Sequence, residues 1–237
     1  MLLFCSPLRR VWLTVAIAAS VAGLIAVDGA SASGVACQTW APQPPDRGSS
    51  SNALNGVAAT STCNAWAVGY SVSSFATQTL VERWNGRGWR IQPSPNVGGS
   101  GASDSLAAVA ATSPGNAWAV GVSSPGFTAQ TLIEHWDGHL WSAQTSRNPG
   151  GPTNDNQLRG VAATSSSNAW AVGYDLKGTG PALIEHWNGK AWHVQASSGP
   201  GSDNSLTGVA AISAFNAWAA GSYYNGSVLQ NLAMHCC

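Results

Sequence analysis

Charge is scarce in this sequence of 237 residues: 8% of the residues are charged, and ten Lys and Arg balance ten Asp and Glu. The few basic residues form no stripe that would neutralise phosphates, so no nucleic-acid partner is expected. Trp (12), Gly (27) and Pro (12) are instead plentiful. A disordered chain has few aromatic residues and much charge, so this composition predicts a folded protein.

Sequence motifs of catalysis are also absent. The chain has no G-x-S-x-G nucleophile elbow, no H-E-x-x-H zinc motif and no Gly-rich phosphate loop. Its cysteines and histidines do not have zinc-site spacing. We therefore predict no catalytic residue, no metal centre and no cofactor, with a Ca²⁺ ion as the one alternative considered below.

The N-terminus has the pattern of a secretory signal. Arg9 and Arg10 precede an apolar run over 11–27, and the small residues Ala30 and Ala32 follow it. This pattern predicts a signal peptide at 1–32, cleaved after Ala32, and a secreted, extracellular protein of residues 33–237 with no permanent membrane span. Association with the cell envelope remains open, and the alternative is an uncleaved anchor, for which 17 residues are marginal.

A repeat of about 50 residues fills the rest of the chain. The first three units contain a segment like Gly-Val-Ala-Ala, an Asn-Ala-Trp-Ala segment and a segment like Leu-Ile-Glu-His-Trp, with a further Trp five residues later. In the fourth unit the third segment is degenerate, from Leu232 to Cys236. The second segment places Trp at intervals of 52, 52 and 48 residues, at Trp66, Trp118, Trp170 and Trp218. The last Trp of the unit recurs at Trp89, Trp141 and Trp192, and Trp40 has the same role before the first full unit.

Each unit is predicted to contain four short antiparallel strands, called a to d. The apolar runs are four to six residues long, and Ser, Asn, Gly and Pro separate them. The fold class is therefore all-β, a β-propeller of four-stranded blades, with strand a innermost. Asn or Asp followed by Gly, as at Asn85 and Gly86, predicts tight hairpins between strands c and d because these residues tolerate positive φ.

The unit resembles kelch-type propeller repeats, in which an apolar strand ends in Gly and an aromatic residue is followed by Asn-Gly and a later Trp. It is more closely similar to the GVAATS…NAWAVG…EHWNG repeats of uncharacterised secreted bacterial proteins. The resemblance covers residues 40–235 and departs from kelch in having a single Gly, as at Gly69, where a pair is usual. It implies a fold rather than a function.

The four units form either a closed four-blade ring or part of a larger propeller. Joined end to end, Cys236 and Cys237 followed by Cys37 to Trp40 match the segment from Trp136 to Trp141, so the N-terminal strand can complete the last blade. Cys37 would then lie within disulfide reach of Cys236 or Cys237. Cys63 is a competing partner for Cys37, or a free thiol.

The repeated Glu residues have His or Arg neighbours in the predicted strand c. Three such pairs could bind a metal or act as acid and base, but repetition around a propeller places them far apart. We therefore predict repeated structural hydrogen bonds or ion pairs. The pairs are Glu82 with Arg83, Glu134 with His135, and Glu185 with His186.

The candidate binding face is the end of the blades that carries the d–a and b–c loops, because those loops vary among the repeats. Polar residues lie there just before each strand a, and Tyr174 lies in a b–c loop. Converging carboxylates and amides can hold a sugar hydroxyl or a Ca²⁺ ion, and the alternative is turn capping. The candidates are Asn52, Asp104, Asp155, Asn156, Asp203, Asn204 and Tyr174.

These observations predict a secreted, monomeric, non-enzymatic binding module whose partner is a glycan, an extracellular protein or an envelope component. The variable loops carry mainly Ser, Gly, Asn and Pro, which disfavours catalysis. Two alternatives remain. One is a propeller enzyme that acts on carbohydrate as a hydrolase or lyase, supported by fold analogy alone. The other is a degenerate structural fragment of a larger propeller.

Overall fold

The computed structural model describes residues 51–73, 76–99, 101–175, 180 and 182–237. The predicted signal peptide, Cys37 and Trp40 lie outside these residues. The described part of the chain is all-β and has no helix. In particular, it contains no helix with the length and apolarity that crossing a bilayer requires.

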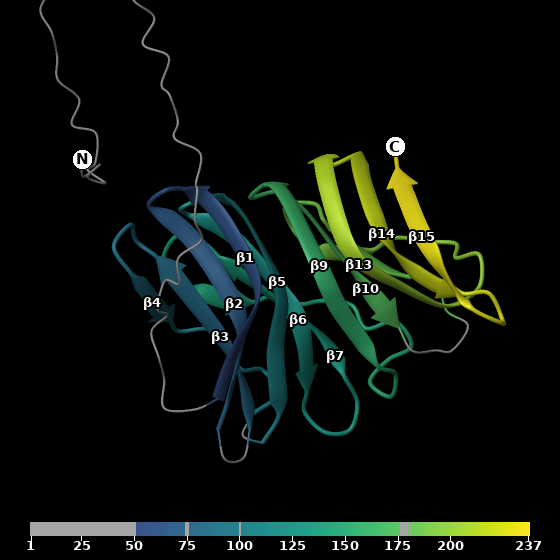
Figure 1. Cartoon of the computed structure of the whole chain (residues 1–237), viewed down its shortest axis with the longest axis horizontal. Coiled ribbons are helices and arrows are strands. Elements are labelled where there is room, and N and C mark those ends of the chain that lie inside the picture. The colour runs from purple at the N-terminus through teal and green to yellow at the C-terminus, as the bar shows by residue number, and fades with distance from the viewer. Residues whose placement is uncertain (1–50, 74–75, 100, 176–179, 181) are drawn as a thin grey trace, which may run out of the picture. The chain divides into compact units, whose positions relative to one another are not determined.

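The strands follow the repeat, and within each repeat each strand pairs with the next in antiparallel fashion to give a group of strands that we call a blade (Figure 1). A parallel bridge between Thr77 and Ser103 joins the first two blades into one sheet. The first blade contains β1 (Ser51–Ser61), β2 (Asn64–Val72), β3 (Thr77–Trp84) and β4 (Trp89–Gln92). The second contains β5 (Ser103–Ser113), β6 (Asn116–Ser124), β7 (Gln130–Trp136) and β8 (Trp141–Ala143). The third contains β9 (Asn156–Ser165), β10 (Asn168–Asp175), β11 (Leu183–Trp187) and β12 (Trp192–Val194). The fourth contains β13 (Ser202–Ser213), β14 (Asn216–Tyr224) and β15 (Leu229–Cys236).

The predicted four-stranded antiparallel unit is confirmed in the first three blades, and the fourth has strands a to c among the described residues. Among the residues that the structure describes, the blades do not close into a ring. Val57 on the outer face of the first blade is 70% exposed, and Trp218 on the outer face of the fourth is 51% exposed.

The core lies between successive blades and is built from tryptophan. Trp66 of the first blade packs against Trp136 and Trp141 of the second, with ring centroids 5.0 and 5.1 Å apart. Trp118 of the second blade meets Trp187 and Trp192 of the third in the same way. Aromatic rings in tilted and edge-on contacts combine large buried area with favourable quadrupole geometry. The first and second blades are therefore each covered by two Trp of the blade that follows.

The glycine that recurs in strand b is required by the packing of the backbone. At Gly121 an added Cβ would lie 2.0 Å from the carbonyl oxygen of Ser105 in strand a, where the register shifts between Leu106 and Ala108. The corresponding distances are 1.8 or 1.9 Å in the other blades. The glycine is thus required by the close approach of strand a at a β-bulge. Its equivalents are Gly69, Gly173 and Gly221.

The hairpins between strands c and d differ from the tight two-residue turn. Trp84 pairs with Trp89, which leaves a loop of four residues. Gly86 adopts a φ of 89°, as expected, but Asn85 does not have positive φ. Its Oδ1 instead accepts hydrogen bonds from the backbone N–H groups of Arg87 and Gly88, at 3.0 and 3.1 Å. Asn is favoured here because its side chain caps the loop.

Candidate functional site

A polar cavity lies between the third and fourth blades, at the end that carries the variable loops. Its volume is about 280 Å³, close to the lower end of the range for small-molecule sites. The third blade contributes residues near the start of β9 and the end of β10, and the fourth contributes the start of β13. The lining residues are Arg159, Tyr174, Asp175, Asp203, Asn204 and Ser205.

One wall of the cavity is fixed by Asn204, which is 2% exposed. Its Nδ2 donates to the carbonyl oxygens of Gly180 and Gly201, both at 2.9 Å, and so joins the b–c loop of one blade to the d–a loop before the next. Gly199 makes room for this side chain, because a Cβ there would lie 2.1 Å from Asn204 Oδ1. That Oδ1 is buried and has no hydrogen-bond partner among the described residues.

The backbone is strained at this wall. Asp203 has a φ of 51°, and no other non-glycine residue of the described chain has positive φ. Left-handed φ is uncommon for residues with a side chain, and such strain clusters at functional sites. Asp203 is exposed and lines the cavity.

The opposite wall combines a cation with an aromatic ring. The guanidinium carbon of Arg159 lies 4.7 Å from the ring centroid of Tyr174, within range of a cation–π contact. Asp175 is next to Tyr174 at the end of β10. The cavity therefore presents a guanidinium, two carboxylates, an amide, a hydroxyl and an aromatic ring, which are groups that bind polyhydroxylated ligands through paired hydrogen bonds and stacking.

Three of the seven sequence candidates thus meet in one cavity, namely Tyr174, Asp203 and Asn204. The other four do not line it. Asn52 is exposed in β1, where it pairs with Ser71. Asp155 Oδ1 accepts a hydrogen bond from the N–H of Ala129 at 2.6 Å.

Asp104 and Asn156 are buried, and each forms a hydrogen bond with the backbone of the loop that precedes it. Asp104 Oδ2 accepts a hydrogen bond from Gly98 N at 3.2 Å, and Asn156 Nδ2 donates to Asn154 O at 3.0 Å. These contacts are those of the turn-capping alternative. No group of three or more His, Cys, Asp or Glu in the described ranges is arranged to hold a metal ion, so the Ca²⁺ site stays a prediction.

Sequence reasoning missed Arg159, Asp175 and Ser205. Arg159 carries a usable signal, because the residue before the Gly-Val-Ala-Ala segment is Asn55, Ala107 or Thr207 in the other repeats. A charged side chain at one copy of an otherwise small or polar position indicates a local role. Nothing in the sequence indicates that residues of β10 and β13, from two different blades, line the same cavity.

The repeated His and Arg residues of strand c are structural, as predicted. His135 stacks on Trp118 at 3.9 Å, and its Nε2 is 2.8 Å from Asn116 Oδ1. His186 repeats this arrangement with Trp170 and Asn168. Burial lowers the pKa of both imidazoles.

Glu185 faces the preceding blade rather than its His neighbour. Glu185 accepts hydrogen bonds from Ser146 Oγ at 2.8 Å and from Arg147 N at 3.3 Å. Burial raises its pKa to about 7, although these two donors act in the opposite direction. Glu134 is the equivalent in the second blade, and neither of its buried carboxyl oxygens has a partner in the described chain. Burial, with a smaller effect of the Asp104 charge, raises its pKa to about 8.

The difference between the two glutamates comes from the preceding loop. Arg147, which donates to Glu185, is replaced by Pro95 in the loop that precedes the second blade. Proline has no N–H to donate. Ser94 lies 2.7 Å from Thr79 Oγ1, as Ser146 does from Thr131 Oγ1, but unlike Ser146 it makes no hydrogen bond to the glutamate of the next blade. Glu134 is therefore buried without the donors that its counterpart has.

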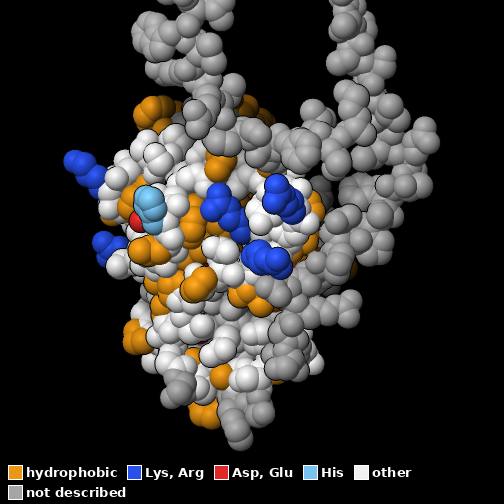
Figure 2. Space-filling model, turned by 90° about the vertical axis from the view of Figure 1, so that its left-hand side faces the viewer, with side chains coloured by type: hydrophobic (Ala, Val, Ile, Leu, Met, Phe, Trp, Pro, Cys, Tyr) orange, Lys and Arg blue, Asp and Glu red, His pale blue; other side chains and the backbone are white. Residues whose placement is uncertain are grey.

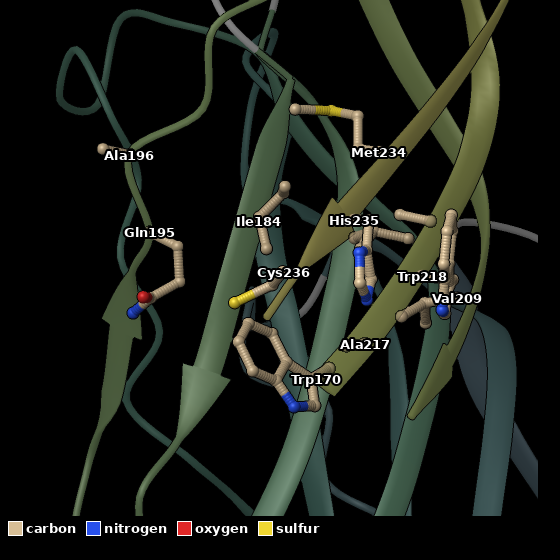
Figure 3. Close-up of a pocket in the computed structure, with 12 residues that line it drawn as sticks. Trp170, Ile184, Gln195, Ala196, Val209, Ala217, Trp218, Met234, His235 and Cys236 are labelled. Atoms are coloured by element: carbon tan, nitrogen blue, oxygen red, sulfur yellow. The ribbon is translucent and has the colours of Figure 1, made fainter. Parts of the chain in front are cut away.

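An apolar cavity of about 130 Å³ lies at the other end of the same blade pair (Figure 3). Its lining includes Trp170, Ile184, Met234 and Cys236. Cys236 occupies the strand position that Trp136 and Trp187 have in the second and third blades. The cavity is thus explained by packing, since the bulky residue that covers the preceding blade is a small one here.

We expect the substitution Cys236→Trp to stabilise the protein by about 1–2 kcal/mol, because filling an apolar cavity commonly gives that gain. Thermal unfolding in the presence of reductant measures the effect without any contribution from a disulfide bond. The exposed neighbour offers a matched control, Cys237→Trp, which should leave the melting temperature unchanged. Equal effects of the two variants would contradict the packing explanation.

The thiols of Cys236 and Cys237 are free and exposed. Cys63 lies in the turn between β1 and β2, with its Sγ 3.7 Å from Thr62 Oγ1. Because the thiols of Cys236 and Cys237 are both free, the predicted bridge from Cys37 to Cys236 or Cys237 is not present in the structure, and Cys63 is disulfide-bonded rather than a free thiol.

A second surface contrasts with the polar cavity. The side of the molecule occupied by the first blade shows basic side chains gathered among hydrophobic ones (Figure 2). The hairpin of β3 and β4 contributes Arg87 and Arg90, which are exposed. Arg83 is held inward, over the ring of Trp66 and with its Nε 3.1 Å from Asn64 Oδ1.

No protein-family model and no curated protein sequence matches this chain. Among solved structures, YCF48 bound to a D1 peptide is 13% identical with a TM-score of 0.43, and this chain spans 65% of its length with 77% of its own. YCF48 from Cyanidioschyzon merolae is 12% identical, with a TM-score of 0.31 and 70% of that chain covered by 77% of this one. A mutant Aleuria aurantia lectin in complex with Fucα1-6GlcNAc is 13% identical with a TM-score of 0.46, and 72% of this chain covers 54% of that one. With TM-scores below 0.5 these likenesses carry no argument here, and the candidate site rests on the geometry described above.

Proposed function

We propose that the protein is an exported, non-enzymatic binding module of the β-propeller class that holds a carbohydrate in the polar cavity between its third and fourth blades. The observation that supports this most is the meeting of Arg159, Tyr174, Asp203 and Asn204 in one cavity of suitable size. Sugars carry hydroxyl pairs that match a guanidinium, a carboxylate or an amide, and a C–H face that packs on an aromatic ring.

The charges of the cavity narrow the ligand class. One guanidinium and two carboxylates line it, and Asn204 keeps one buried oxygen available as an acceptor. A ligand with many hydroxyl donors satisfies these acceptors, whereas an anionic ligand would meet two carboxylates. We therefore propose a neutral or amino sugar rather than a sulfated or phosphorylated one.

The variant Arg159→Ala is expected to weaken carbohydrate binding by about 10- to 100-fold, because a hydrogen bond to a charged group contributes about 1.5–3 kcal/mol. A panel of immobilised oligosaccharides identifies the ligand, and calorimetry measures its affinity. Arg90→Ala removes an exposed arginine of the first blade and is the matched control, which should bind as the unaltered protein does.

A second variant distinguishes an effect on binding from an effect on stability. Asp203→Gly removes the carboxylate and also relieves the left-handed strain, so it should weaken binding without lowering stability. The proposal fails if no oligosaccharide binds, or if both Arg159→Ala and Asp203→Gly bind as tightly as the unaltered protein. Release of reducing sugar from a bound oligosaccharide would favour the hydrolase alternative over a binding module.

A further inference from the structure

The outer face of the fourth blade has the composition of a contact between blades but lacks a neighbour. Trp218 is 51% exposed, whereas its equivalents Trp66, Trp118 and Trp170 are at most 3% exposed. It stacks on His235 at 3.9 Å, as Trp118 stacks on His135 beneath the third blade. The same face exposes small and apolar side chains of all three strands, namely Ala210, Ile212, Ala220 and Ala233.

A glycine of strand a marks the same face as a site of close backbone approach. At Gly56 an added Cβ would lie 2.9 Å from the Cα of Ala108 in the second blade, and at Gly160 it would lie 3.0 Å from the carbonyl oxygen of Thr207 in the fourth. The fourth blade has the equivalent Gly208, but no atom lies within 4 Å of a Cβ built there. Gly208 is therefore present although no strand of a following blade packs against it in the described chain.

The first blade offers the matching surface. Interfaces between blades place a Leu, a Val and two Trp of one blade over the Trp of the preceding blade, as Leu106, Val109, Trp136 and Trp141 lie over Trp66. The corresponding residues of the first blade have no preceding blade: Leu54 is 43% exposed and Val57 is 70% exposed. Trp84 and Trp89 are partly exposed and already packed together at 5.9 Å, close to the 6.0 Å of Trp136 and Trp141.

We propose that the fourth blade of one copy of this chain packs against the first blade of a second copy, with the same contact that joins blades within the chain. The two faces belong to different surfaces of the molecule, so the contact is heterologous, and it either closes into a ring of several copies or grows. The contact continues an interface that the chain repeats three times, and Val57 and Trp218 show that the two faces do not cover each other within one copy.

The variant Gly208→Val tests this proposal without disturbing the single chain, because open space surrounds the added side chain. We expect sedimentation velocity at tens of micromolar to give at least twice the monomer mass for the unaltered protein and the monomer mass for Gly208→Val. Gly126→Val places the same side chain at another open glycine, in a b–c loop, and should associate as the unaltered protein does.

A mixing experiment establishes which faces meet. Val57→Arg blocks the face of the first blade, so this variant alone should also be monomeric. Mixed with Gly208→Val it should form a 1:1 dimer through the one pair of intact faces. A monomeric unaltered protein overturns the proposal. Association that persists in Gly208→Val, or that is not restored on mixing, overturns it as well.

Discussion

The substitution Glu134→Gln is expected to stabilise the protein progressively more as the pH rises from 5 to 8. The carboxyl group of Glu134 is buried without a partner in the described residues, and its pKa is raised from 4.5 to about 8. A raised carboxyl pKa means that the folded state holds a proton that the unfolded state has already released. The protonated Glu134 carboxyl group thus leaves the free energy of unfolding undiminished below pH 4.5, and this free energy falls as the pH rises towards 8.

The size of this effect follows from linkage. A shift of one unit corresponds to about 1.4 kcal/mol, so Glu134 lowers the free energy of unfolding by roughly 3–5 kcal/mol between pH 4.5 and pH 8. Glu185 acts in the same direction up to a pH of about 7, whereas His135 and His186, whose pKa values are lowered, cost stability at acid pH. The measurement is therefore the difference between Glu134→Gln and the unaltered protein, from denaturant unfolding at several pH values.

The loop that precedes the second blade supplies an independent check. Pro95→Ala restores the backbone N–H that Arg147 provides to Glu185, and it should reduce the pH dependence by lowering the pKa of Glu134. If the unaltered protein and Glu134→Gln lose stability in parallel from pH 5 to 8, the carboxyl group is not the source of the effect.

The substitution Gly121→Ala is expected to prevent stable folding. The added Cβ would lie 2.0 Å from the carbonyl oxygen of Ser105, a separation far below van der Waals contact, so strands β5 and β6 would have to part at the bulge. Overpacking in a rigid interior costs about 1–3 kcal/mol, and backbone that cannot yield costs more. A domain has only about 5–15 kcal/mol of stability in total.

The same blade provides the matched control. Gly115→Ala lies in the turn between β5 and β6, where the nearest atom to an added Cβ is 3.8 Å away. We expect the soluble yield and the melting temperature of Gly115→Ala to equal those of the unaltered protein, while Gly121→Ala gives little soluble protein. A melting temperature for Gly121→Ala within a few degrees of the unaltered protein would show that the strands can separate at small cost.

The repeat determined most of what could be predicted of the fold. Some residues recur from unit to unit, such as the Trp of strand b and the Gly of the loop between strands c and d. Their recurrence indicates that they have the same structural role in each blade. The reason for Gly121 was not visible, because the bulge that requires it lies in another strand. The four-residue loop at Asn85 was also not predicted. Asn is favoured both where φ is positive and where a side chain caps a loop, so its presence does not distinguish a two-residue turn from a longer loop.

The candidate site was predicted in part for a different reason. Tyr174 and Asn204 were predicted at the variable loops; the structure places them in strands β10 and β13 beside those loops, and both line the cavity. Asp104 and Asn156 occupy equivalent positions in the sequence, yet their side chains serve their own loops. Which copy of a repeated position faces an open cavity depends on packing between two blades, and neither blade alone encodes it.

The tryptophan contacts impose an order on folding. Trp66 is covered by Trp136 and Trp141, so 75 residues separate the first blade's aromatic ring from the last part of its cover. Synthesis at about 5–20 residues per second leaves that indole exposed for roughly 4–15 s. Each indole is therefore covered only after the next blade has been synthesised, and Trp218, which no described blade covers, remains 51% exposed.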